Sequence, residues 1–185
     1  MRLAILGGPG AGKGTQAKQL SQFLGLTWVS TGEGLRQEIA ASTDLGQQVQ
    51  TQILQGDLVP DEAVIGWIRD RLVQPDVLDG WILDGYPRTA FQAEELDFLL
   101  DDLQQRLELV VWLEVPEAVL MERSLAMGRL DDQPATIQRR IQQFRERSSP
   151  LIEYYEFNNR LLQVDGNQAI ERVHQEILAR LVIGE

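Results

Sequence analysis

The segment best suited to chemistry lies near the amino terminus, where residues 7–16 read GGPGAGKGTQ. It holds the pattern G-x-x-x-x-G-K between an apolar run typical of a strand and a helical pattern, which is the context that this pattern requires. Glycines let successive backbone N–H groups converge on phosphate oxygens, and the helix amino terminus adds partial positive charge. Lys13 would supply a point charge for the β- and γ-phosphates. The segment predicts a phosphate-binding loop; the alternative is a glycine-rich turn that binds nothing.

Two carboxylates could serve a metal ion near this loop. Gly14 stands where the general pattern places a Ser or Thr that contacts magnesium, and Thr15 follows it. The departure indicates a magnesium ion held less directly, through water and a more distant carboxylate. Asp84 and Glu114 each follow an apolar, strand-like run. Both are therefore candidates for that carboxylate.

The composition excludes several classes of protein. The chain has 185 residues, a formal net charge of −11, no cysteine and one histidine. Disulfides, a thiolate nucleophile and a cysteine zinc site are excluded, and a zinc site built almost entirely from carboxylates is improbable. The negative charge disfavours nucleic acids and anionic membrane surfaces as partners.

The basic residues are unevenly divided between the two types. Lysine occurs only as Lys13 and Lys18, and every other basic residue is arginine. The planar fork of arginine recognises phosphate with two parallel hydrogen bonds. Some arginines could gather in an anion pocket, although most are expected to pair with surface carboxylates.

The elements that must position these residues alternate along the chain. Short apolar runs bounded by turns are typical of parallel strands buried on both faces, and helical patterns separate them. The pattern predicts a doubly wound α/β sheet. Two segments interrupt the alternation, residues 31–59 and 126–134, and such inserts are where a substrate domain or a lid would lie. The predicted strands are residues 3–6, 28–29, 81–83, 109–115 and 161–164.

No apolar run is long enough to span a bilayer. The amino terminus also lacks the long apolar stretch and small-residue cleavage site of a secretory signal. We expect a reduced, cytoplasmic location.

Further motifs share an order along the chain. STGEGLR spans residues 30–36, GDLVPDE 56–62, DGYPRT 84–89 and GRLDD 128–132. With the glycine loop, they resemble the nucleoside monophosphate kinases, and the adenylate kinases in particular, over nearly the whole chain. The resemblance implies one P-loop domain, 1–185, as a three-layer sandwich. It implies a five-stranded parallel sheet with helices on both faces, a helical NMP-binding insert at 30–59 and a short lid at 124–134.

The family resemblance also implies the activity, a reversible phosphoryl transfer in which ATP and AMP give two ADP with Mg²⁺. Because no covalent protein intermediate is needed, the protein would position the nucleotides and neutralise their charge. Arg123 would stack on the adenine of ATP. Asp84 is preferred to Glu114 as the carboxylate that orients Mg²⁺ through water, because Gly85 and Arg88 follow it as in the family. The ATP phosphates would lie against Gly10, Ala11, Gly12, Lys13, Gly14 and Thr15.

For AMP, the resemblance implies a second set of residues. Thr31 and Gln92 would hydrogen-bond the base, and Arg36 with Arg88 would clamp the phosphate. Val59 and Gly85 would line the pocket, and Arg129 and Arg140 would meet phosphates in the closed state. The residues implied to act in catalysis are Lys13, Arg88, Arg123, Arg129 and Arg140.

The chain departs from the family pattern in two places. Glu33 and Gly34 stand where Asp and Leu are usual, and Gly34 is expected to loosen its helix by about 1 kcal/mol. Residues 123–129 are shorter than in other short-lid members and lack an arginine that usually lies between the two ends. If a transition-state arginine were truly missing, roughly 10³-fold in rate, or about 4 kcal/mol, could be lost. The long zinc-bearing lid of other members is absent, and no zinc is expected.

Two rival functions remain. A UMP/CMP kinase would share the loop and the arginines, although Thr31, Thr89 and Gln92 favour adenine. A regulatory protein that binds nucleotides without turnover would not need the AMP clamp. The family suggests a monomer whose partners are ATP, AMP and ADP.

Overall fold

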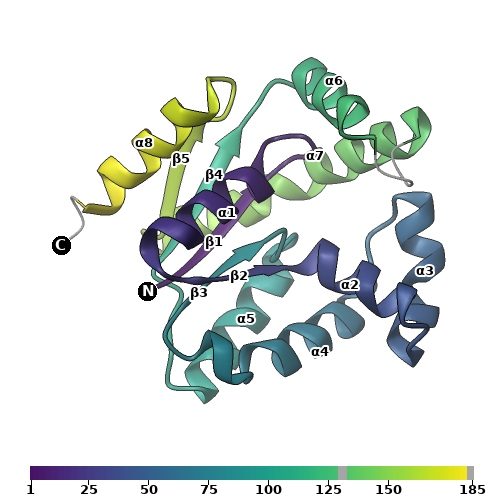
Figure 1. Cartoon of the computed structure of the whole chain (residues 1–185), viewed down its shortest axis with the longest axis horizontal. Helices are drawn as coiled ribbons and strands as arrows, with labels where there is room; N and C mark the ends of the chain where they lie inside the picture. Colours follow the sequence, from purple (N-terminus) through teal and green to yellow (C-terminus); the bar gives the residue numbers. More distant parts are fainter. Residues whose placement is uncertain (129–132, 183–185) are drawn as a thin grey trace.

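The core is a five-stranded parallel sheet in the order β2-β3-β1-β4-β5. A computed structural model describes residues 1–128 and 133–182, and Figure 1 shows the arrangement. The five predicted strands and the α/β fold class are confirmed, with small shifts at the strand ends. The strands are β1 (Arg2–Gly7), β2 (Thr27–Ser30), β3 (Trp81–Asp84), β4 (Leu109–Glu114) and β5 (Leu161–Asp165).

Helices cover both faces of the sheet. Those after β1 are α1 (Lys13–Leu24), α2 (Thr31–Ala40), α3 (Asp44–Gln55) and α4 (Asp61–Leu72), the last followed by the short 3₁₀ helix η1 (Pro75–Val77). The remaining helices are α5 (Ala90–Asp102), α6 (Glu117–Met127), α7 (Pro134–Phe157) and α8 (Ile170–Val182).

The central strand β1 supplies both hydrophobic cores. Leu3 and Ile5 point to a core shared with α1, α6 and α8, whereas Ala4 and Leu6 point to a core shared with α4 and α5. All four side chains are buried because successive residues of a strand face opposite sides of a sheet that is covered on both. Helix α7 serves both cores, its first half packing in one and its second half in the other.

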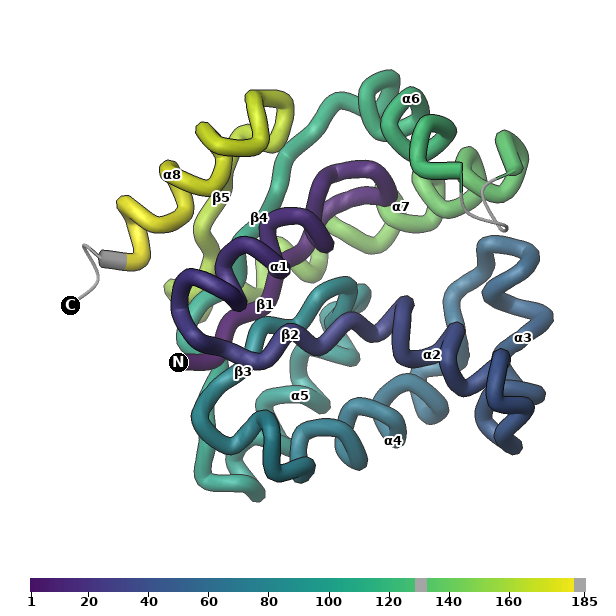
Figure 2. Tube along the Cα trace, viewed as in Figure 1, coloured from purple at the N-terminus to yellow at the C-terminus, as the bar shows by residue number. Residues whose placement is uncertain are grey.

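Of the helices between β2 and β3, α2 and α3 stand away from the sheet, whereas α4 packs against it (Figure 1). Ser30 caps α2 and Thr43 caps α3, each accepting a hydrogen bond from a backbone N–H of the first turn. Figures 1 and 2 show α2 and α3 projecting to one side, with α3 beside the start of α7. The segment that α2 and α3 form is helical as expected, and its definition as a separate insert stays a prediction.

The sheet order fixes where a ligand can bind. β1 and β4 are neighbours, but the chain leaving β1 runs to β2 at one edge and the chain leaving β4 runs to β5 at the other. A crevice opens between two such connections at the carboxyl ends of the strands, and open α/β sheets bind ligands there. The glycine loop begins at the carboxyl end of β1, where that strand ends with Gly7.

Candidate active site

The glycine loop has a backbone that its sequence requires. Gly10 and Gly12 have φ of 78° and 94°, a region that glycine enters at little cost. A Cβ on Gly10 would lie 2.5 Å from the carbonyl oxygen of Leu120 in α6. Gly12 is the N-cap of α1 and has no side chain to satisfy the first N–H groups of that helix. The amino terminus of α1 is therefore available to an anion.

Lys13 lies over this loop. Its ammonium donates hydrogen bonds to the carbonyl oxygens of Gly7 at 2.9 Å and Gly8 at 2.8 Å. These contacts hold the positive charge at the mouth of the loop, where a phosphate group could also accept from it.

Asp84 ends β3 beside the same helix. Its side chain is buried, at 9% exposure, and its Oδ2 lies 3.3 Å from the point that a Cβ of Gly14 would occupy. Glu114, the other candidate carboxylate, is exposed at the end of β4 and faces β5, in register with Asp165. Of the two carboxylates, Asp84 is the one in contact with the first turn of α1.

Three of the predicted arginines converge. Arg36 in α2, Arg88 after β3 and Arg140 in α7 each donate to a backbone carbonyl, at 2.6 Å, 2.8 Å and 3.2 Å. Desolvation lowers the pKa of Arg88, nearby Asp84 opposes that shift, and the charges of Arg140 and Arg36 lower the pKa further. Arg88 is exposed to solvent, and a guanidinium stays charged at neutral pH. The mutual repulsion of three cations makes this place favourable for an anion.

Of the other two predicted arginines, Arg123 contacts a different part of the chain. Arg123 in α6 donates to the carbonyl oxygen of Gly166, 2.9 Å away, in the turn after β5. Arg129 lies outside the described residues, so its contact with the phosphates stays a prediction.

The residues predicted to hold the AMP base are mostly buried. Thr31 and Gln92 are each 2% exposed, and Gly85 is buried with a φ of 83°. The hydroxyl of Thr31 has no hydrogen-bond partner among the described residues. Val59 is half-buried and packs against the hydrophobic core that includes α4 and α5. A buried hydroxyl without a partner is uncommon in folded proteins, and a ligand would satisfy it.

Sequence reasoning missed one residue of this region, Asp61. Its Oδ1 accepts a hydrogen bond from Nε2 of Gln92 at 2.7 Å, although 31 residues separate the two. Asp61 belongs to the GDLVPDE motif, which was the only signal that pointed to it.

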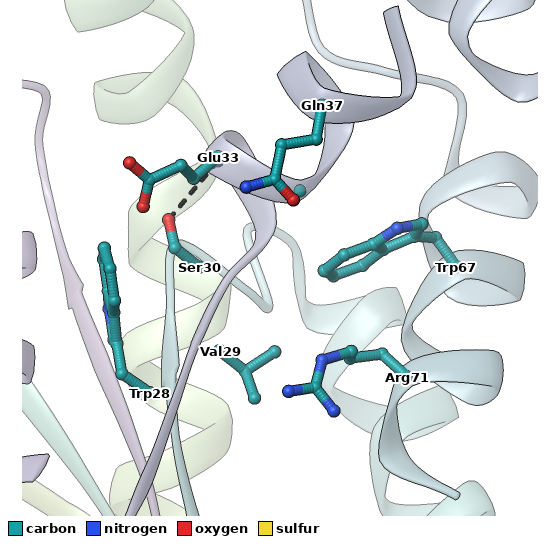
Figure 3. A pocket seen from close by; sticks show the side chains of 8 residues that line it. Trp28, Val29, Ser30, Glu33, Gln37, Trp67 and Arg71 are labelled. Carbon is teal, nitrogen blue, oxygen red and sulfur yellow. Dashed lines mark hydrogen bonds between the residues drawn. The ribbon is translucent and has the colours of Figure 1, made fainter. Parts of the chain in front are cut away.

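A separate hollow of about 220 Å³ lies between β2, α2 and α4, as Figure 3 shows. Trp67 and Arg71 of α4 face Val29 across it, and none of the predicted site residues that the structure describes lines it. Its volume is below the range of about 300–1,000 Å³ that is typical of ligand sites.

Within the described ranges, no group of three or more metal-binding side chains occurs. The same part of the chain contains no helix long and apolar enough to cross a bilayer.

A glycine loop between the central strand and a helix, with a lysine over it and a carboxylate from the neighbouring strand, defines a P-loop nucleotide-binding protein. The family model for adenylate kinase matches residues 5–160. An adenylate kinase 2 of Nostoc sp. is 52% identical over 99% of this chain and 100% of its own length. An adenylate kinase 2 of Synechocystis sp. is 50% identical over 98% and 100%, and an adenylate kinase of Stenotrophomonas maltophilia is 42% identical over 98% and 99%. The chain belongs to the adenylate kinase family, and it is an enzyme, a phosphotransferase.

Proposed function

We propose that this protein catalyses the reversible reaction ATP + AMP = 2 ADP and so balances the adenine nucleotides. The observation that carries the proposal is the convergence of Arg36, Arg88 and Arg140 in a chain whose net charge is −11. Cations that repel one another at a crevice are stabilised by an anion. Two nucleotides that meet at their phosphates would bring a high negative charge to these three arginines.

On the ATP side, the loop of residues 10–15 holds the phosphates and Lys13 follows the transferred group. Support comes from the amino terminus of α1, which has no side-chain cap, and from the position of the Lys13 ammonium over the loop. Arg123 stacks on the adenine. Asp84 suits a Mg²⁺ ion that keeps most of its waters, because it offers one buried carboxylate rather than a full set of ligands. When bound with ATP, the ion neutralises phosphate charge.

On the AMP side, Arg36 and Arg88 clamp the phosphate, and Arg140 joins them. Thr31 and Gln92 bind the base, and Val59 and Gly85 line the pocket. The unpartnered hydroxyl of Thr31 and the burial of Gln92 support this assignment. Arg129 completes the phosphate contacts from the lid.

Two segments beside the site change position when the nucleotides bind. Residues 30–59 form the NMP-binding insert and residues 124–134 the lid, and both close over the nucleotides to keep water from the transferring group. The protein works as a monomer in the cytoplasm.

Steady-state formation of ADP from ATP with AMP, CMP or UMP as acceptor tests the proposal. We expect AMP to exceed both pyrimidine nucleotides in kcat/KM by at least about 100-fold, because a site that hydrogen-bonds one base leaves buried groups unpaired with another. Equal kcat/KM for AMP and the pyrimidine nucleotides would contradict the adenine preference, and a higher kcat/KM for CMP or UMP would establish the pyrimidine kinase instead. ATP binding without turnover of any acceptor would establish a regulatory role.

A further inference from the structure

The amide of Gln92 is held from two sides by the protein itself. Its Nε2 donates to Oδ1 of Asp61 at 2.7 Å, and its Oε1 accepts from the backbone N–H of Arg88 at 2.8 Å. The backbone of Gln92 is fixed as well, because its N–H donates to the hydroxyl of Thr89, the N-cap of α5. Gln92 is 2% exposed, so water does not compete effectively for these bonds.

The two partners fix which way round the amide lies. An ionised carboxylate can only accept hydrogen bonds, so Asp61 requires the nitrogen end of the amide. A backbone N–H can only donate, so Arg88 requires the oxygen end. Both requirements are met by one orientation and both are violated by the reverse orientation. The assignment therefore follows from the chemistry of the partners.

The orientation has a consequence for the base that the amide can read. An amide has two N–H groups and two oxygen lone pairs, and one of each is used internally. The N–H and lone pair that remain match the adenine edge, where N1 accepts and the 6-amino group donates. Hypoxanthine presents the reverse pattern, an N1–H donor beside an O6 acceptor, and would need the amide turned by about 180°.

We propose that Asp61 is a positioning residue that sets base specificity, by locking the Gln92 amide in the orientation that reads adenine and rejects 6-oxopurines. The inference rests on the proposed function, since it takes Gln92 to contact the base of AMP. Asp61 itself acts through Gln92. It is well placed to do so, because it is the first residue of α4 and lies opposite the first turn of α5.

A purely structural role predicts something different. The same hydrogen bond ties α4 to α5, and its loss could simply loosen the pocket. Loosening would weaken the use of AMP and IMP together. Loss of the orientation lock would weaken AMP and improve IMP, because the reverse orientation becomes accessible.

The experiment compares wild type with Asp61→Asn in steady-state kinetics with ATP as donor and AMP or IMP as acceptor. Asparagine keeps the size of the side chain but can accept or donate, so it no longer excludes the reverse orientation. We expect the ratio of kcat/KM for AMP over IMP to fall about 10-fold. The change should lie in KM and come mainly from better use of IMP, since the Arg88 N–H still favours the original orientation.

Glu62→Gln is the matched control. It removes a carboxylate from the same turn of α4, but Glu62 is exposed and has no hydrogen bond to Gln92. We expect its AMP/IMP ratio to equal that of wild type. If the thermal midpoint of Asp61→Asn shows that the variant does not fold, Asp61→Ser replaces it, because a hydroxyl also accepts and donates.

The outcomes separate the two proposals. An AMP/IMP ratio that stays unchanged in the Asp61 variant, or parallel losses with both acceptors, would overturn the positioning role while the kinase function stands. Wild-type protein that fails to phosphorylate AMP would overturn the kinase function and this inference with it.

Discussion

At the scale of single residues, the site depends on charges that the loop itself holds in place. The ammonium of Lys13 binds two carbonyl oxygens, so phosphate can replace partners that the lysine already has in the free protein. Such an exchange limits the cost of desolvating the lysine when the nucleotide binds. The lysine is then placed before the reaction begins, and preorganised charge of this kind usually contributes more to catalysis than any other single effect.

Lys13→Met should lower kcat/KM for ADP formation by about 10²–10³-fold, because it removes the preorganised positive charge that stabilises the transferred phosphoryl group. The chain offers an internal control. Lys18, its only other lysine, lies five residues on in α1 with its ammonium 4.3 Å from the centre of the Trp28 ring, away from the loop. Lys18→Met should keep full activity. A coupled assay of ADP formation measures the activity of both variants. A fully active Lys13→Met with the wild-type thermal midpoint would remove the basis of the proposed mechanism.

Two departures become understandable in three dimensions, that of Gly14 from the general loop pattern and that of Gly34 from the family pattern. Gly14 lies against the Asp84 carboxylate, so the missing hydroxyl at position 14 coincides with an acidic group close by. A Cβ on Gly34 would lie 2.1 Å from Cζ2 of Trp67, so the glycine makes room for the indole. The first could be anticipated from the sequence, because both residues sit in recognisable motifs. The second could not, because a contact between α2 and α4 leaves no trace in local spacing.

At the scale of elements, the end of α3 meets the start of α7. Gly56 ends α3 with a φ of 75°, and a Cβ there would lie 2.7 Å from Cγ2 and 2.9 Å from the carbonyl oxygen of Thr136. Next to it, Asp57 pairs with Arg139 at 2.5 Å and accepts from Gln143 at 2.8 Å. Arg139 makes this pair while about half of its side chain stays exposed to solvent. These contacts join the predicted insert to the helix that carries Arg140.

Gly56→Ala should destabilise the protein more than Gly25→Ala does. Both glycines end a helix in the left-handed region, at φ of 75° and 68°, so both variants carry a cost of about 1–2 kcal/mol. Of the two, only Gly56 has close neighbours, since no atom of the described residues lies within 4 Å of a Cβ on Gly25. The clash with Thr136 should add at least about 1 kcal/mol. Urea unfolding measures both variants, and equal losses would show that α3 and α7 do not pack this closely in solution.

The predicted and observed elements differ most in the helices. The strands could be predicted because their short apolar runs are each followed by a small, acidic or proline residue, namely Gly7, Ser30, Asp84, Pro116 and Asp165. Helix α7 could not, because it continues through Pro150, a residue that removes a backbone donor and ordinarily ends a helix. Its burial compensates, with Ile137 and Ile141 in one core and Leu151 and Tyr155 in the other. The local signal at Pro150 is therefore overridden by packing.

At the scale of the whole molecule, three tyrosines make the free energy of unfolding depend on pH in the alkaline range. Burial raises the pKa of Tyr86 and Tyr155. Burial, followed by the hydrogen bond to Asp97, raises the pKa of Tyr154 to about 12. Tyr154 and Arg160 both donate to Asp97, so a carboxylate on α5 anchors the end of α7 and the start of β5. This junction depends on two contacts, one between residues 57 positions apart and one between residues 63 positions apart, and the sequence does not reveal such contacts.

The raised pKa of Tyr154 predicts how the free energy of unfolding depends on pH. A pKa that is higher in the folded state than the value of about 10 in the unfolded chain means that folding favours the neutral phenol. This contribution is complete below pH 10 and is lost as the pH rises from about 10 to about 12. Tyr154→Phe should be less stable than wild type near pH 8, because it lacks the bond to Asp97, and the difference should shrink above pH 10. The slope of the free energy of unfolding against pH should differ between wild type and Tyr154→Phe by less than about 1.4 kcal/mol per pH unit, the limit for one proton. The difference stays below this limit since the Tyr154 side chain is partly exposed. Urea unfolding between pH 8 and 11.5 gives both curves, with Glu153→Gln as a control on the same helix. Parallel curves for wild type and Tyr154→Phe would show that Tyr154 does not ionise on unfolding in this range.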